Sequence, residues 1–369
     1  MPGSSTPSSD SQPRSTSLRA VGACAPVTGG GAIPGLPDAA AFRVIAADPA
    51  SIPVVLATPH AGRCYPDHVL AALRAPDHVL LRLEDRLVDR LAEAVAQETG
   101  APLIVADAPR AMIDLNRSVD DIDWDMLADG PRPAGHRNHS ATSAHRARSG
   151  LGLVPRRLPG VGELWKTRLH HADLAERITM IHEPYHAALA QMIDRVRAQW
   201  GAVLLIDLHS MPPLPAHGGA SAQFVVGDRF GTACDGELIA SIFSYLAAER
   251  RPVAHNRPYA GGFVLDRHAR RSAGVHAVQI EIDKIAYLDS AMAEPGAGFD
   301  SVVTLLVGLV RRLAVDVASL GRDRLRCQEQ HPSASGRARN QSHSASTRYH
   351  RRGDSQAPAR WPVCQQRPG

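Results

Sequence analysis

The sequence is poor in three features, and each absence excludes a class of protein. It has five cysteines in 369 residues and no Cys-x-x-Cys pair, which argues against a disulfide framework and against a thiolate zinc site. No apolar run approaches the roughly 18 residues of a membrane-spanning helix, and the N-terminus lacks the apolar core of a signal peptide. Aromatic residues make up only 4% of the chain, so aliphatic side chains must fill its core. We predict a soluble, cytoplasmic protein without a membrane partner.

The chain also has little net charge outside its C-terminal tail. The formal net charge is +4, but the tail from Gln328 onward holds seven arginines against Glu329 and Asp354. The residues before it therefore carry a net charge of about −1. A basic tail can attract nucleic acid, yet this one has no helical periodicity and few aromatic residues for stacking on bases. We predict that the tail is disordered and solvated, and we do not expect nucleic acid as a partner.

The composition divides the chain into three parts. Residues 1–37 are rich in Ser, Pro and Gly, which predicts a disordered N-terminal segment. Residues 38–325 carry the periodic apolar patterns and are predicted to form one folded domain. Residues 326–369 form the basic tail.

Apolar runs bounded by turn residues predict buried strands, and apolar residues at helical spacing predict helices. The predicted strands lie at 53–57, 102–106, 202–206, 223–226 and 278–282, and the predicted helices at 77–99, 163–198, 235–250 and 298–320. Strands that alternate with helices predict an α/β sandwich with a mostly parallel sheet.

Polar residues beside three of these strands suit a metal site. His60 follows the first strand, His209 follows the strand 202–206, and Glu281 lies within 278–282. In open α/β sheets, ligands bind at the carboxyl ends of the strands, and two histidines with a carboxylate there suit a catalytic zinc. His209 stands two residues after Asp207, as expected of a metal ligand that a carboxylate orients. Taken alone, a loop histidine such as His60 is more often structural.

The carboxylates leave alternatives open. A third metal ligand should be acidic, and the sequence offers Glu84 with Asp85 beside it, although such a pair is usually a solvated helix face. Glu281 lies among apolar neighbours, which should raise its pKa and suit it to proton transfer near neutral pH. It could also belong to the outward face of an edge strand, together with Gln279 and Asp283.

A candidate anchor for a substrate lies between Arg110 and Ser118. The pair Asn116-Arg117 stands there, and guanidinium binds a carboxylate through two parallel hydrogen bonds. A surface arginine in an ion pair is the common alternative.

One further segment resembles a metal-binding motif. Residues 182–186 match the H-E-x-x-H pattern of zinc proteases. That pattern needs both histidines on one face of a continuous helix. Pro184 favours a helix that begins there, so His182 and His186 are not expected to share a face. We therefore do not predict a zinc-protease site.

Short motifs between residues 42 and 320 occur in an order that is specific as a set. They include Pro59-His60-Ala61-Gly62, Glu84-Asp85, Asp114-Leu115-Asn116-Arg117-Ser118, Pro184-Tyr185-His186, Asp207-Leu208-His209-Ser210 and Gln279-Ile280-Glu281-Ile282. Together they closely resemble the N-formylglutamate amidohydrolase family. One element departs from the family, whose first motif usually has Ser where this chain has Ala61.

The resemblance implies a fold and a reaction. The fold is that of the zinc carboxypeptidases, a three-layer sandwich with a mixed, mostly parallel sheet and helices on both faces. The reaction is hydrolysis of an N-acyl amino acid by the domain 38–325. In this family the small-molecule substrate is N-formyl-L-glutamate, and the products are formate and glutamate, as in histidine degradation. The implied cofactor is Zn²⁺ or another divalent metal.

The resemblance also implies a role for individual residues of the site. His60, Glu84 and His209 are the expected metal ligands, and Asp85 is the rival of Glu84. Glu281 is the expected general base.

The remaining expected roles concern binding of the substrate. Asn116 and Arg117 are expected to bind a substrate carboxylate. Arg110 would help them or stabilise the oxyanion, and Arg156 would make a second carboxylate contact.

Two other functions stay open at this point. One is a deacylase of another N-acyl amino acid or of a small peptide, which an assay that compares acyl groups would separate. The other is a metal- or nucleic-acid-binding protein that acts through its basic tail. Removal of residues 328–369 would abolish the function of such a protein and leave an amidase intact.

Overall fold

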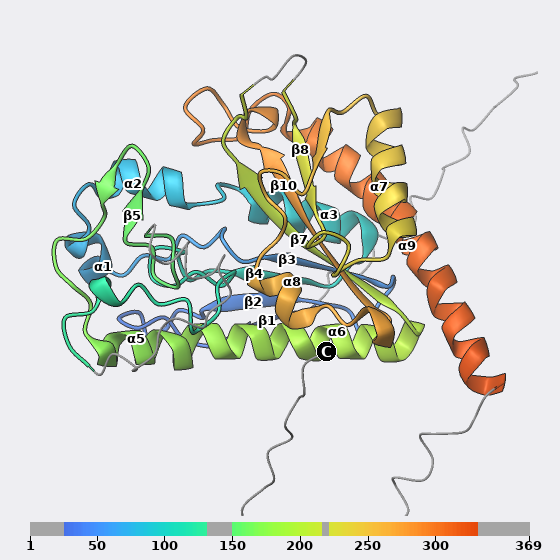
Figure 1. Cartoon of the computed structure of the whole chain (residues 1–369), viewed down its shortest axis with the longest axis horizontal. Helices are drawn as coiled ribbons and strands as arrows, with labels where there is room; N and C mark the ends of the chain where they lie inside the picture. The colour runs from blue at the N-terminus through green and yellow to red at the C-terminus, as the bar shows by residue number, and fades with distance from the viewer. Residues whose placement is uncertain (1–25, 131–149, 216–220, 331–369) are drawn as a thin grey trace, which may run out of the picture. The chain divides into compact units, whose positions relative to one another are not determined.

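The described part of the chain is built on a mixed sheet of eight strands. The computed structural model describes residues 26–130, 150–215 and 221–330, where the strands follow the order β1-β2-β4-β3-β7-β10-β8-β9 (Figure 1). Their bounds are β1 Val27–Gly30, β2 Phe42–Ile45, β3 Val54–Thr58, β4 Leu103–Ala106, β7 Val203–Met211, β8 Phe224–Gly227, β9 Val253–His255 and β10 Val275–Asp283. The central strands β4, β3, β7 and β10 are parallel to one another, and β2 and β8 flank them antiparallel. The predicted mixed, mostly parallel sheet is confirmed.

Helices cover both faces of this sheet, which confirms the predicted three-layer sandwich (Figure 1). One face carries α3 Val88–Thr99, α7 Gly236–Ala248 and α9 Phe299–Gln330. The other carries α1 Asp67–Ala72, α2 Pro76–Leu83, α5 His171–Arg177, α6 Glu183–Trp200 and α8 Phe263–His268. A small separate ribbon joins β5 Arg157–Leu158 to β6 Gly162–Glu163.

Alternation along the central strands explains where polar residues gather. In β7, Val203 and Leu205 point to the core beneath α6, because successive side chains of a strand face opposite sides. Asp207 and His209 continue the same row toward the carboxyl end of β7, and Glu281 occupies the corresponding end of β10. One face of the sheet is therefore apolar at the beginning of these strands and polar at their end. His209 lies within its strand, not after it as expected.

The continuous helix expected over 77–99 is wrong, because the chain breaks between α2 and α3. Glu84 has extended backbone angles and Leu87 has a positive φ of 60°. The amide of Asp85 donates to the carbonyl oxygen of His60 at 3.0 Å. This bond ties the break to the end of β3 and brings Asp85 next to His60.

The helix expected over 163–198 begins later, at α5, and continues through Pro184 into α6. A five-residue π-helical stretch, Ile178–His182, joins the two helices. Pro184 cannot donate to the carbonyl oxygen of Met180, four residues earlier, and the amide of Ala32 donates to that oxygen instead at 3.0 Å. The expected helix start at Pro184 is therefore wrong.

The predicted boundaries at both ends need correction. The disordered segment predicted over 1–37 is too long, since β1 pairs antiparallel with β2. The tail predicted over 326–369 begins inside α9, which reaches Gln330. The rest of both predicted segments, 1–25 and 331–369, lies outside the described residues. No helix in the described part of the chain is long and apolar enough to cross a membrane.

Candidate active site

A cavity of about 820 Å³ lies at the carboxyl ends of β3, β7 and β10. This is the edge of the sheet at which open α/β folds bind ligands. The cavity is lined by six of the residues predicted from the sequence, namely His60, Arg110, Asn116, Arg117, His209 and Glu281. Its lining also includes side chains to which the sequence assigned no firm role, among them Arg82, Asp85, Tyr259, Gln279 and Lys284.

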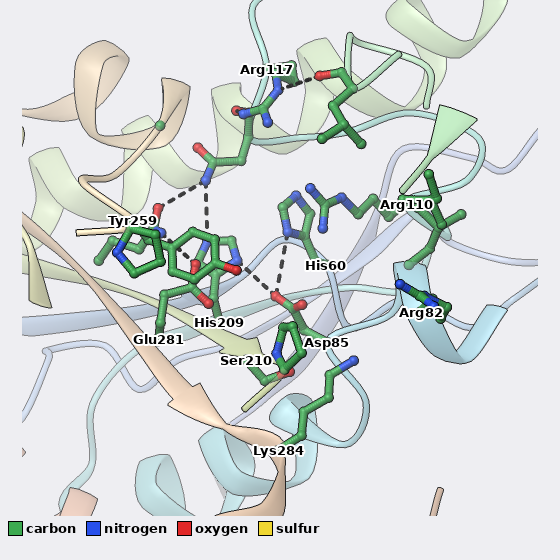
Figure 2. A pocket seen from close by; sticks show the side chains of 18 of the residues that line it. His60, Arg82, Asp85, Arg110, Arg117, His209, Ser210, Tyr259, Glu281 and Lys284 are labelled. Atoms are coloured by element: carbon green, nitrogen blue, oxygen red, sulfur yellow. Dashed lines mark hydrogen bonds and ion pairs between the residues drawn. The ribbon is translucent and has the colours of Figure 1, made fainter. Parts of the chain in front are cut away.

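Two histidines and one carboxylate meet in this cavity (Figure 2). Nδ1 of His209 lies 2.8 Å from Oδ2 of Asp85, and Nδ1 of His60 lies 3.5 Å from the same oxygen. One ligand atom from each residue lies within 4.8 Å of the other two, and all three residues are buried. Two imidazole nitrogens and a carboxylate oxygen are a donor set that suits a divalent metal such as zinc.

The other nitrogen of each histidine faces a second carboxylate. Nε2 of His60 donates to Oδ1 of Asp114 at 2.7 Å, and Nε2 of His209 donates to Oδ2 of Asp207 at 2.9 Å. Metal-binding histidines commonly have such a partner, which fixes the ring and leaves the other nitrogen for the ion. We call His60 and His209 the carboxylate-linked histidines.

The surrounding charges set the protonation of this group. Burial alone would lower the pKa of His209, but the carboxylates of Asp207 and Asp85 raise it well above its usual value. Burial would raise the pKa of Asp85, but hydrogen bonds from His209 and His60 hold it below its usual range. Asp114 is also held ionised against its burial, because Arg110 and His60 lower its pKa. Asp85 and Asp114 are therefore held in their ionised form.

Glu84 does not join the two histidines. Its carboxylate accepts hydrogen bonds from the hydroxyl of Tyr65 at 3.1 Å and from Arg86 at 3.1 Å. The backbone break after α2 points Asp85 into the cavity and Glu84 away from it. The carboxylate beside the histidines is thus that of Asp85, the alternative to Glu84 among the predicted ligands.

Glu281 lies directly beside His209, because the two residues are register partners in the parallel pair of β10 and β7. β10 is a central strand, so the edge-strand alternative is wrong. Burial raises the pKa of Glu281 to about 7, against the opposing effect of His209. Nε2 of Gln279 donates to Oε1 of Glu281 at 2.8 Å. A carboxylate so placed can exchange a proton near neutral pH.

Gln279 links Glu281 to the predicted substrate anchor. Its Oε1 accepts a hydrogen bond from Nδ2 of Asn116 at 3.2 Å. Oδ1 of Asn116 in turn accepts from the amide of Val264 at 2.9 Å. Gln279 is not among the residues predicted to act in the site, although its place two residues before Glu281 puts both side chains on one face of a strand.

Two arginines of the anchor segment reach the cavity by different routes. Arg110 pairs with Asp114 through Nε at 2.9 Å and lies beside His60 (Figure 2). Arg117 donates from Nε to the carbonyl oxygen of Leu151 at 3.0 Å and from Nη1 to that of Asn116 at 2.9 Å. These bonds fix the plane of the Arg117 guanidinium at the cavity wall.

Arg156 does not line this cavity. Its Nε donates to Asp123 at 2.7 Å and its Nη1 to Glu163 at 2.7 Å. These ion pairs hold Arg156 beside the β5–β6 ribbon, so the structure does not bring it to the other predicted residues.

The histidines of the H-E-x-x-H segment form a second buried group. His182 and His186 do share a face, contrary to expectation, with ring centroids 4.5 Å apart. Nε2 of His182 donates to the carbonyl oxygen of Arg117 at 2.9 Å, and Nε2 of His186 donates to that of Leu115 at 3.0 Å. Nδ1 of His186 then accepts from Nε2 of His268 at 3.0 Å. We call these three residues the carbonyl-linked histidines.

The carbonyl-linked histidines are neutral. Burial lowers the pKa of His182, lowers that of His186 well below its usual value, and lowers that of His268 to about 3. Both Nε2 protons of His182 and His186 are committed to backbone oxygens. The group therefore supports the segment that carries Asn116 and Arg117, and it offers no cluster of free ligand nitrogens.

Comparison with known proteins gives four consistent matches. The family model of N-formylglutamate amidohydrolase matches residues 52–288. An N-formylglutamate deformylase from Pseudomonas aeruginosa is 27% identical over 286 residues, which cover 74% of this chain and 95% of that protein. One from Pseudomonas putida is 28% identical over 253 residues, which cover 67% of this chain and 86% of that protein. The crystal structure of an N-formylglutamate amidohydrolase from Ralstonia eutropha has a TM-score of 0.67 at 31% identity and covers 75% of this chain and 98% of its own.

Proposed function

This chain belongs to the N-formylglutamate amidohydrolase family, and from this premise we propose that it hydrolyses the formyl amide of N-formyl-L-glutamate to formate and glutamate. The observation that carries the proposal is the position of Glu281 beside His209, next to side chains that can hold a divalent metal. Relatives named N-formylglutamate deformylase support the choice of substrate.

We assign the metal-binding role to His60, Asp85 and His209. Asp85 takes the place expected for Glu84, because its carboxylate faces both histidines. The donor set fits Zn²⁺ or another divalent ion. When bound, such an ion polarises the amide carbonyl and lowers the pKa of a coordinated water toward about 7.

Glu281 is the proposed general base and acid. With a pKa of about 7, its carboxylate can take the proton of the attacking water and pass it to the leaving amine as the C–N bond breaks. The hydrogen bond from Gln279 holds one of its oxygens. The same bond couples the orientation of Glu281 to Asn116, which also contacts Gln279.

Two cationic side chains of the cavity, Arg117 and Arg110, are proposed to act on the substrate. Arg117, with Asn116 beside it, binds the α-carboxylate through its guanidinium. Arg110 lies next to His60 and donates to the oxygen on which negative charge develops during attack. Asp114 keeps the Arg110 guanidinium in place through its 2.9 Å ion pair.

The test is release of formate from N-formyl-L-glutamate by the purified protein. We expect turnover that a chelator abolishes, and a loss of about 10²- to 10⁴-fold in kcat for Glu281→Gln with unchanged metal content. Asp283→Asn is the matched control, because Asp283 is an acidic residue of the same strand that does not line the cavity. Absence of formate release contradicts the proposed reaction, and an unchanged kcat for Glu281→Gln contradicts the assignment of the base.

A second candidate function is deacylation of another N-acyl amino acid. It is favoured by the cavity volume of about 820 Å³, which exceeds the volume of a whole N-formyl-L-glutamate molecule and so leaves room for a larger acyl group. Comparison of formyl, acetyl and succinyl glutamate in one assay separates the two. The alternative function through the basic tail depends on residues 331–369, which lie outside the described part of the chain. The cytoplasmic location stays a prediction.

A further inference from the structure

Lys284 is a buried cation to which the proposed chemistry assigns no role. It follows β10 directly and is only 6% exposed. Its Nζ donates to the carbonyl oxygens of Leu81 at 3.2 Å and Glu84 at 2.7 Å, at the end of α2. Within the described residues, no carboxylate lies within ion-pair distance of this ammonium group.

The ammonium group of Lys284 has capacity for one more acceptor. It carries three N–H groups, and the two carbonyl oxygens use two of them. Carbonyl oxygens do not neutralise the charge, and burial lowers the pKa of Lys284 because a buried charge is unfavourable without a counter-charge. Lys284 lines the cavity, so an anion bound in the cavity can supply both the acceptor and the charge.

Among the described residues that line the cavity, basic side chains outnumber acidic ones. Its lining holds four basic side chains, Arg82, Arg110, Arg117 and Lys284, against two acidic ones, Asp85 and Glu281. Arg110 is already paired with Asp114. If Arg117 takes one carboxylate of the substrate, Lys284 is the buried cation of the cavity with no direct ion-pair partner among the described residues, although the charges of Asp85, Glu84 and Glu281 act on it from further away. Arg117 and Lys284 lie on opposite sides of the His60–Asp85–His209 group (Figure 2).

We propose that Lys284 binds the side-chain carboxylate of the substrate and selects dicarboxylic N-acyl amino acids over neutral ones. This inference rests on the proposed hydrolysis of N-formyl-L-glutamate and adds the residue that recognises the side-chain carboxylate. Arg117 and Lys284 then hold the two ends of the substrate, and the amide lies at the metal-binding group between them. Arg82 is exposed and donates to the carbonyl oxygen of Pro159 at 3.1 Å, so solvent screens its charge and its contribution is smaller.

The competing role for Lys284 is purely structural. Its bonds to Leu81 and Glu84 cap the end of α2 and help to place Asp85. Loss of such a cap would disturb the metal-binding group and slow the reaction with every substrate alike. Loss of a carboxylate contact would slow only the reaction of substrates that carry the carboxylate.

The test compares N-formyl-L-glutamate with N-formyl-L-glutamine, which differ only in the side-chain carboxylate. Lys284→Met is expected to lower kcat/KM for the glutamate substrate by about 10- to 100-fold, and for the glutamine substrate by less than about threefold. Lys284→Arg is expected to recover most of the preference. Arg82→Met, the matched control with the same charge change in the same cavity, is expected to lower kcat/KM for the glutamate substrate by less than about threefold. Equal losses with both substrates, or equal effects of Lys284→Met and Arg82→Met, overturn the proposal.

Binding of glutarate tests Lys284 independently of turnover. Calorimetry with the wild-type protein is expected to show tighter binding of glutarate than of its monoamide, and Lys284→Met is expected to weaken glutarate binding by about tenfold or more. Thermal unfolding and metal content show whether the variant is folded and loaded. A wild-type protein that releases no formate contradicts the proposed function, whereas equal binding of glutarate and its monoamide contradicts the role of Lys284.

Discussion

The protein contains two groups of buried histidines that differ in the oxygens they face. The carboxylate-linked histidines, His60 and His209, contact Asp85, Asp114 and Asp207. The carbonyl-linked histidines contact backbone oxygens and one another. Burial acts to lower the pKa of His209 and of the carbonyl-linked histidines alike, yet the pKa of His209 is raised while those of the carbonyl-linked histidines fall.

This difference shows that burial alone does not decide what a histidine does. A carboxylate partner leaves one ring nitrogen basic and directed at a shared point, which suits metal binding. Backbone carbonyl oxygens accept hydrogen bonds from the ring N–H groups of His182 and His186, and the second nitrogen of His186 accepts from His268, so these imidazoles support a backbone segment. The H-E-x-x-H pattern lies in the second group, so its match to zinc proteases is a coincidence of sequence.

The largest expected effect separates Asp85 from its neighbour. Asp85→Asn removes a carboxylate ligand and should lower metal affinity by more than about 100-fold, since changes in partners outside the ligand set already cost 10- to 100-fold. Glu84→Gln is the matched control and should retain the metal, because Glu84 contacts Tyr65 and Arg86 instead. Metal content after dialysis, with competition by a chromophoric chelator, measures both. If Glu84→Gln loses the metal and Asp85→Asn keeps it, Glu84 is the third ligand.

A smaller effect is expected where a carbonyl-linked histidine supports the substrate anchor. His182→Leu leaves the carbonyl oxygen of Arg117 without its donor, at a cost of about 1–3 kcal/mol. The displaced anchor should raise KM for N-formyl-L-glutamate about tenfold, with kcat and metal content little changed. His182→Gln retains an N–H donor and should restore most of the affinity. If His182→Leu loses the metal, the carbonyl-linked histidines take part in metal binding and do not differ in role from the carboxylate-linked histidines.

The smallest expected effect is on stability against pH. The pKa of His268 is about 3 in the folded protein and about 6.5 in an unfolded chain. Between these values the unfolded chain binds a proton that the folded protein does not, so the free energy of unfolding falls as pH drops below about 6.5. The glutamine in His268→Gln can still donate to His186 but does not titrate. Between pH 7 and pH 5.5 the free energy of unfolding of this variant should therefore fall by about 1 kcal/mol less than that of the wild type. Denaturant unfolding at both pH values measures the difference, and identical losses would show that His268 is not buried as a neutral group.

The features that the sequence predicted correctly are local ones. Apolar runs predicted the central strands, and the alternation of strands and helices predicted the sandwich, because each pattern depends only on neighbouring residues. The same locality placed His60, His209 and Glu281 at the carboxyl ends of strands. The position of Gln279 in the site could have been predicted in the same way, because strand alternation puts it on the same face as Glu281.

The features that the sequence did not predict depend on distant contacts. The break that turns Asp85 toward the histidines is held by the hydrogen bond from the Asp85 amide to the carbonyl oxygen of His60. The helix passes through Pro184 because Ala32, from the segment after β1, satisfies the carbonyl oxygen that the proline leaves without a donor. Helical periodicity and proline statistics describe a chain segment by itself, and here contacts from other segments outweighed them.

The pairing of β7 with β10 has a consequence for how this site can change. His209 and Glu281 are opposite one another on two central strands, so hydrogen bonds of the sheet fix their separation, and no loop has to hold it. The residues proposed to contact the substrate, Arg117 and Lys284, lie outside those strands. Directed evolution of the surrounding loops can therefore explore new acyl groups and side chains while the spacing of the reactive pair is inherited unchanged.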